Sequence, residues 1–148
     1  MSLIVEKSVP VVAAPETIWG LLTNPQSWPE WWPDCIAAKA SGPAHFGEGS
    51  RLELVLQPGL MKMTFRPEVD LYTENKTLSM TQRSTLVQAT VTWYLQPKSE
   101  GTRVSVRGVF QGPLFFLMRI LQQGSAPMVA LTTQLRGLRR TAERMGSV

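Results

Sequence analysis

The sequence has little of the chemistry on which many enzymes and metalloproteins depend. Among 148 residues there is one histidine, His45, and one cysteine, Cys35. A lone cysteine cannot form a disulfide within the chain, and this pair provides no cluster with metal-ligand spacing. The first ten residues also lack the basic start and apolar core of a secretory signal. We therefore expect no metal, no cofactor and a reducing, cytoplasmic location.

Charged residues and long apolar runs are also scarce. Only 18% of residues are charged, the formal net charge is +4, and the basic residues are spread along most of the chain. The exception is a basic C-terminus, where cations would complement the negative end of a helix dipole. The longest strongly apolar run, residues 114–118, is followed by Arg119 and is far shorter than the ~20 residues of a membrane span. We expect no nucleic-acid partner and no stable membrane insertion.

Candidates for catalysis are few. His45 lies in a loop flanked by glycine and proline, which favours a surface position over a general base. No nucleophile-elbow sequence or glycine-rich phosphate loop is present. Weak acid–base candidates are His45, Gln82 and Tyr72, and strand alternation predicts that Gln82 faces inward while Tyr72 and Arg66 face outward. We assign no catalytic residue.

The first part of the chain predicts a strand and two short helical segments. Residues 4–12 are rich in β-branched side chains, which favours a strand. Pro15 suits the first position of a helix, and this helix should end before Pro25. Residues 25–33 hold three tryptophans and three prolines, so we expect at most a turn or so of helix with stiff connections.

The middle of the chain alternates with the period of two that is typical of strands. We predict strands at residues 35–40, 51–57, 61–71, 77–83, 87–96 and 104–110, joined by turns tight enough to require antiparallel pairing. In the strand at 61–71, Met61, Met63, Phe65, Val69 and Leu71 should share one face. Pro67 lies inside it and indicates a bulge or an edge position.

The last part of the chain predicts a broken helical region. One straight helix over residues 113–144 would measure roughly 48 Å, which is longer than a small domain, so we expect a break at residues 124–127. The following piece carries an apolar stripe that should pack across the sheet, formed by Met128, Leu131, Leu135, Leu138, Ala142 and Met145. Residues 114–121 are apolar nearly all round. They are either buried on both sides or face a ligand, a partner or a lipid surface.

Three segments carry a family resemblance: residues 11–19 (VVAAPETIW), 28–33 (WPEWWP) and 47–50 (GEGS). With the order of elements they resemble the START-like superfamily, which includes polyketide cyclases and dehydratases and lipid- or hormone-binding proteins. The resemblance covers essentially the whole chain, so residues 1–148 are expected to form a single domain. It implies an α+β helix-grip fold, in which a curved antiparallel sheet wraps around a long C-terminal helix and encloses a hydrophobic cavity, with two short helices after the first strand.

Such a cavity would be lined by inward residues of the strands and of the helix. Our ligand-binding candidates are Met63, Phe65, Met80, Gln82, Trp93 and Phe110 from the strands, with Met128, Leu131 and Leu135 from the helix. A gate at its mouth could be formed by Trp28, Trp31 and Trp32, with Leu114, Phe115 and Met118 opposite. Two alternatives stay open at this point: the lining candidates could simply fill a core, and the tryptophans could staple the short helices onto the sheet.

The function predicted from this pattern is binding of a hydrophobic small molecule or lipid-like ligand in the cavity, by a monomer or a homodimer. The resemblance implies an alternative, an enzyme of the polyketide cyclase or aromatase type that acts mainly by positioning its substrate. A third hypothesis is an interaction module that docks through residues 114–121.

Overall fold

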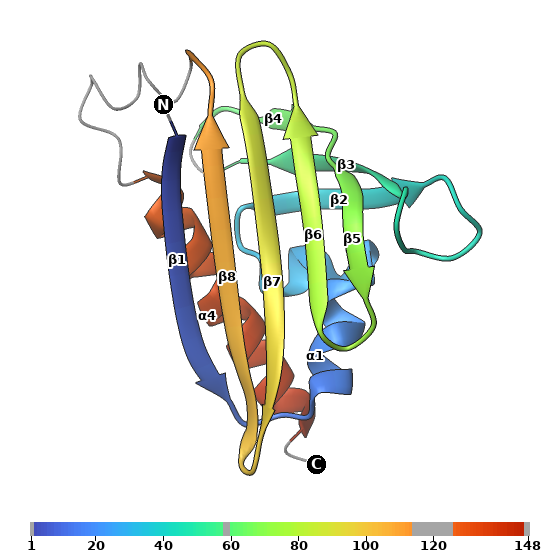
Figure 1. Ribbon diagram of the computed structural model, residues 1–148, viewed down its shortest axis with the longest axis vertical. Helices are drawn as coiled ribbons and strands as arrows, with labels where there is room; N and C mark the ends of the chain where they lie inside the picture. Colours follow the sequence, from blue (N-terminus) through green and yellow to red (C-terminus); the bar gives the residue numbers. More distant parts are fainter. Residues whose placement is uncertain (1, 58–59, 114–125, 147–148) are drawn as a thin grey trace.

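The computed structural model describes residues 2–57, 60–113 and 126–146, and for 126–128 the backbone only (Figure 1). The first half contains β1 (Ser2–Val11), α1 (Pro15–Leu22), η1 (Pro25–Ser27), α2 (Trp28–Trp31), β2 (Cys35–Ser41), β3 (Arg51–Leu56), β4 (Met63–Phe65) and β5 (Glu68–Thr73). The second half contains β6 (Thr77–Arg83), β7 (Gln88–Lys98), β8 (Gly101–Gln111) and α4 (Ala126–Gly146). The element order matches the prediction.

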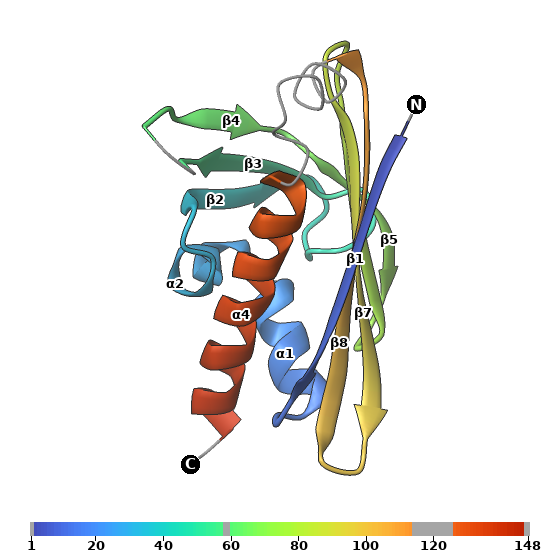
Figure 2. The same ribbon diagram turned by 90° about the vertical axis from the view of Figure 1, so that its left-hand side faces the viewer.

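The strands form one antiparallel sheet in the order β1-β8-β7-β6-β5-β3-β2, with β4 paired to β3. β5 meets β3 at one ladder pair, Arg51 with Glu68, and backbone hydrogen bonds such as Val69 N–H to the Ser50 carbonyl extend this joint. The sheet turns sharply there, so β2, β3 and β4 run across the direction of the long strands (Figure 2). The sheet is therefore strongly curved, and its concave face holds α1, α2 and α4. This is the helix-grip arrangement that the resemblance implied.

The short helices begin and end where proline requires. Pro15 occupies the first turn of α1 and Glu16 adds an acid there, which suits the positive end of the helix. The helix ends at Leu22, because Asn24 precedes Pro25 and is held out of the helical region (φ −119°, ψ 88°). The segment that follows forms only one turn of 3₁₀-helix and one turn of α-helix, as predicted.

Helix α4 packs on the concave face through its predicted stripe. Leu131, Leu135, Leu138 and Ala142 are at most 3% exposed. The helix passes α2 very closely at Gly137, where a methyl group would overlap the Trp31 carbonyl oxygen. This position requires glycine. Met145, expected in the same stripe, is instead 51% exposed, because the helix has passed the edge of the packed core by that point.

The predicted strand at 61–71 is divided. Val69 faces inward as expected, whereas the residues after it have the opposite orientation. Pro67 separates β4 from β5, and a bulge between Val69 and Leu71 shifts the register against β6. Leu71 therefore faces outward and is 46% exposed, whereas Tyr72 faces inward and packs edge-on against Trp19 at 5.2 Å. The prediction that Tyr72 faces outward was wrong, because a bulge reverses strand alternation for every residue after it.

Candidate ligand-binding face

One end of the concave face is tightly packed. Leu78, Trp93 and Val106 lie side by side on β6, β7 and β8, and Leu135 and Leu138 of α4 are buried in the same core. None of these five side chains is more than 1% exposed. Side chains buried this completely leave no room for a ligand among them.

The described elements cover the other end of the same face less completely. One step further along the ladder, Met80 and Val91 are only partly buried, as are their neighbours Gln82 and Ala89 in the next row. Leu3 of β1 and Phe65 of β4 are partly buried as well. We call this set the open end; its members are Leu3, Phe65, Met80, Gln82, Ala89 and Val91. It is an apolar surface that the described elements do not cover completely.

Phe110 and Leu131 separate the open end from the packed end. The Phe110 ring lies over Gly108, so that a Cβ at Gly108 would be 2.5 Å from the ring, and Leu131 of α4 approaches the same point at 3.1 Å. Phe110 is 9% exposed and Leu131 is 3% exposed. These two predicted lining residues form the boundary between the two ends.

Gln82 is the polar side chain that the central strands β6 and β7 place at the open end. Its Oε1 accepts a hydrogen bond of 2.7 Å from the backbone N–H of Arg66. Because the partner is a donor, the side-chain oxygen must face Arg66, and the Nε2 amide is directed elsewhere as a donor. In the described part of the chain no acceptor is bonded to Nε2. Arg66 itself is exposed, and its Nε lies 3.8 Å from Oε2 of Glu53, in agreement with its predicted outward position.

The tryptophans of the short helices form an aromatic cluster. Trp28 contacts Trp31 and Trp32 with ring centroids about 6 Å apart, and Trp31 packs edge-on against Trp93 at 6.2 Å. Trp28 and Trp31 are 1% and 3% exposed, and Trp28 Nε1 donates to the Leu21 carbonyl at 3.1 Å. These two residues therefore staple the short helices to the sheet. Trp32 is only partly buried.

Three indole N–H groups are buried without an acceptor in the described structure, those of Trp19, Trp31 and Trp32. A buried donor without a partner costs about 1–3 kcal/mol. The aromatic cluster thus contains two buried indole N–H groups, on Trp31 and Trp32, that have no acceptor among the described residues.

The predicted site residues fall into four groups. Phe65, Met80 and Gln82 lie at the open end, with Phe110 and Leu131 at its boundary. Met63, at the start of β4, is 39% exposed. Trp28, Trp93 and Leu135 are sealed in the core at 1% exposure each, and Trp32 borders it. Phe115, Met118 and the side chain of Met128 lie outside the described residues. Contact of any of these residues with a ligand stays a prediction.

Comparison with known proteins now identifies the family. Residues 2–143 match the family model described as polyketide cyclase/dehydrase and lipid transport. The chain belongs to this family. Among curated protein sequences, none matches the chain.

Solved structures show how widely this cyclase-family fold occurs. The Zhui aromatase/cyclase from Streptomyces sp. R1128 has a TM-score of 0.79 at 15% identity, covering 97% of this chain and 95% of its own. A START superfamily protein from Mycobacterium smegmatis has a TM-score of 0.78 at 17% identity, covering 96% and 98%. A norcoclaurine synthase point mutant from Thalictrum flavum, in complex with a transition-state analogue, has a TM-score of 0.72 at 14% identity, covering 99% and 98%. At these identities the likeness shows the fold.

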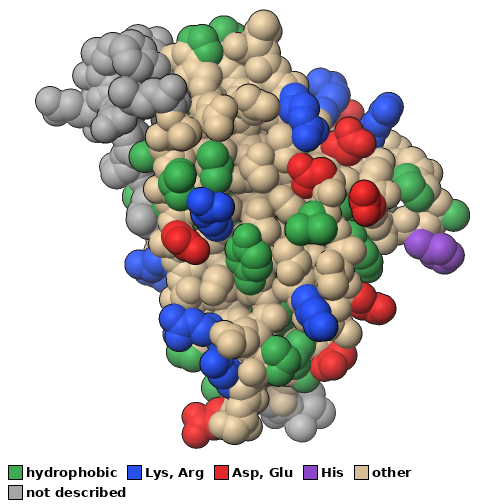
Figure 3. All heavy atoms as spheres, viewed as in Figure 1, with side chains coloured by type: hydrophobic (Ala, Val, Ile, Leu, Met, Phe, Trp, Pro, Cys, Tyr) green, Lys and Arg blue, Asp and Glu red, His purple; other side chains and the backbone are tan. Residues whose placement is uncertain are grey.

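The scarce reactive residues of this family member, His45 and Cys35, are not among the side chains of the open end. His45 is exposed on the loop between β2 and β3, where it projects from the body of the protein (Figure 3). Cys35 is 4% exposed, and burial raises the pKa of its thiol to about 11. A thiol that keeps its proton is a poor nucleophile. Among the described residues, no three His, Cys, Asp or Glu side chains are placed to hold a metal ion.

The charge distribution agrees with the sequence. On the face shown in Figure 3, basic and acidic side chains are interspersed. None of the helices within the described ranges is both long enough and apolar enough to cross a lipid bilayer.

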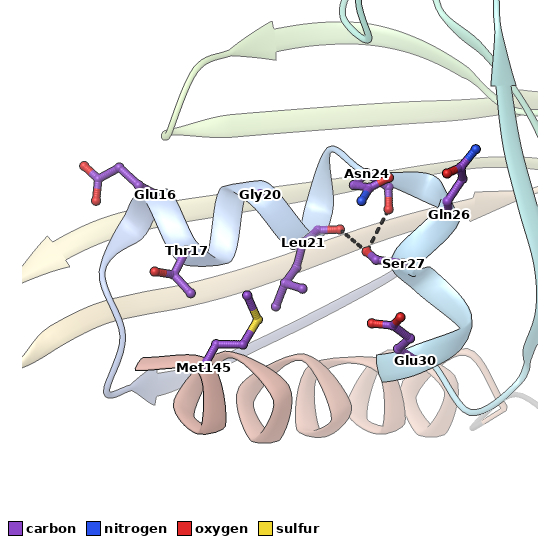
Figure 4. Close-up of a pocket in the computed structure, with 9 residues that line it drawn as sticks. All are labelled: Glu16, Thr17, Gly20, Leu21, Asn24, Gln26, Ser27, Glu30 and Met145. Carbon is purple, nitrogen blue, oxygen red and sulfur yellow. Dashed lines mark hydrogen bonds between the residues drawn. The ribbon is translucent and has the colours of Figure 1, made fainter. Parts of the chain in front are cut away.

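The structure also contains a groove that the sequence did not reveal. It lies between α1, the η1–α2 segment and the end of α4 and has a volume of about 610 Å³ (Figure 4). We call it the α1–α4 groove; its lining residues are Glu16, Thr17, Gly20, Leu21, Asn24, Gln26, Ser27, Glu30 and Met145. The one sequence signal was Gly20, a glycine inside a helix. A glycine inside a helix does not indicate a groove unless the element packed opposite it is known.

Proposed function

We propose that the protein binds a hydrophobic small molecule or a lipid-like ligand at the open end of its concave face, between the sheet and α4. The observation that carries this proposal is the change in burial along single strands. Leu78 and Trp93 are fully buried, whereas Met80 and Val91, the next residues on the same face, remain partly exposed. The described elements therefore leave part of this apolar face accessible to a ligand. Membership of a family that includes lipid transport supports the proposal.

The ligand should carry an oxygen acceptor within an otherwise apolar body. The Gln82 amide is held in place by Arg66 and presents a donor from the same face as Met80 and Ala89. Ketones, esters and quinones match this donor, because a carbonyl oxygen satisfies it without bringing a proton of its own.

An enzyme of the cyclase type is the second candidate, and the family match favours it. Such an enzyme could act by holding a reactive chain in a folded shape, since positioning alone lowers a barrier considerably. Mass spectrometry of a bound poly-ketone before and after incubation separates the two functions. A carrier returns the ligand unchanged, whereas a dehydrating cyclase returns it lighter by one water.

Gln82→Glu tests the role of the amide. Glutamate keeps an oxygen that accepts from the Arg66 N–H, so the connection between β4 and β5 stays anchored. It replaces the Nε2 donor with an acceptor, so the hydrogen bond to the ligand is lost. We expect affinity for 2-decanone to fall about threefold to tenfold, and affinity for decane to change much less. Displacement of the uncharged dye Nile red measures both affinities.

The matched control is Gln88→Glu, which makes the same chemical change on the outward face of β7. It should leave both affinities unaltered. Equal affinity for 2-decanone in wild type and Gln82→Glu, with Nile red still bound, would remove Gln82 from the site. Absence of saturable Nile red binding to the wild-type protein would instead contradict the proposed function.

A further inference from the structure

We propose a second binding site, for a small organic cation with an apolar segment, in the α1–α4 groove. Its volume of about 610 Å³ lies in the usual range for small-molecule sites. The groove shares no residue with the open end of the concave face, so the proposal stands independently of the proposed function.

The charge of the groove selects a cation. Its described lining includes two carboxylates, Glu16 and Glu30, and no Lys or Arg, although the chain as a whole has a formal net charge of +4. Both glutamates are exposed, and the ion pairs found in the described structure involve other acids. They are therefore free to form charge-assisted hydrogen bonds with an ammonium group.

The shape of the groove selects a ligand with an apolar middle. Figure 4 shows Glu16 and Glu30 at opposite ends, with Leu21 and Met145 pointing toward each other between them. Met145 is 51% exposed, and its flexible thioether adapts to aliphatic or aromatic groups alike. A linear molecule with amines at both ends would place each charge near a carboxylate and its hydrocarbon on this floor.

Gly20 keeps the groove open at its centre. A Cβ added there would meet no atom within 4 Å, so packing within the protein does not require glycine. Glycine is also among the weakest helix formers, and Gly20 is the sixth of the eight residues of α1. A ligand that approaches the helix backbone closely would account for a glycine at this position.

Titration with 1,8-diaminooctane, followed by amide and methionine-methyl NMR, tests the site. We expect saturable shifts at the Gly20 amide and the Met145 methyl, with no shift at the Met80 methyl. The neutral analogue 1,8-octanediol should cause none. Glu16→Gln and Glu30→Gln should each weaken binding roughly threefold, and added salt should weaken it further. Glu100→Gln, on the exposed turn between β7 and β8, is the matched control and should have no effect.

Gly20→Leu provides the steric test. Since nothing lies within 4 Å of the new Cβ, the variant should unfold at no lower denaturant concentration than wild type, yet it should abolish the diamine shifts. Retention of these shifts in Gly20→Leu, equal binding of the diol, or shifts that persist unchanged in both glutamine variants would overturn the proposal.

Discussion

Gly137→Ala should lower the free energy of unfolding by about 3 kcal/mol, which is the upper end of the usual cost of overpacking a core. The added methyl would overlap the carbonyl oxygen of Trp31, and the next obstacle is the Pro33 ring at 3.6 Å. A backbone carbonyl cannot rotate away like a side chain, so α4 must move off α2. Urea unfolding, followed by far-ultraviolet circular dichroism, measures the loss.

Gly20→Ala is the matched control for this substitution. It makes the same chemical change in another helix, where the methyl meets nothing within 4 Å. Because alanine is the better helix former, stability should rise by about 0.5–1 kcal/mol. Equal stability changes in the two variants would show that α4 does not approach α2 as closely as described.

Ala89→Trp should reduce Nile red affinity more than tenfold while leaving the protein folded. Ala89 lies at the open end beside Gln82 and Phe110, and a partly buried inward alanine can be enlarged into the space that a ligand would occupy. The indole fills this space with little strain, so we expect stability to change by less than about 1 kcal/mol. Dye titration and urea unfolding give the two quantities.

The control is Gln88→Trp, one residue earlier on β7 and on the outward face, which should bind the dye like wild type. Val91→Phe is a second, smaller blocking variant at the open end and should weaken binding in the same direction. Unchanged affinity in both inward variants would place the ligand elsewhere.

The fold was predictable because its signals are local and repeated. Proline marked the ends of α1 and the break at Pro67, and alternation along β6, β7 and β8 identified the inward face. The position of the bulge after Val69 could not be predicted, because it depends on how β5 pairs with β6. The sequence-based prediction therefore gave Tyr72 the wrong orientation.

The candidate site was predictable only in part, because burial depends on distance between elements. Alternation placed Met80, Gln82 and Trp93 on one face, as found. It could not show that Trp93 belongs to the packed end and Met80 to the open end, since that follows from where α4 crosses the sheet. The hydrogen bond from Arg66 to Gln82, which fixes the amide donor, joins residues 16 apart and leaves no trace in the sequence.

Methyl NMR of protein labelled at methionine tests the central claim most directly. The chain has seven methionines, of which Met80 lies at the open end and Met145 in the α1–α4 groove. On saturation with 2-decanone, we predict a clear shift of the Met80 methyl and no change at Met145. Saturable binding that leaves the Met80 methyl unmoved would contradict a ligand site on the concave face.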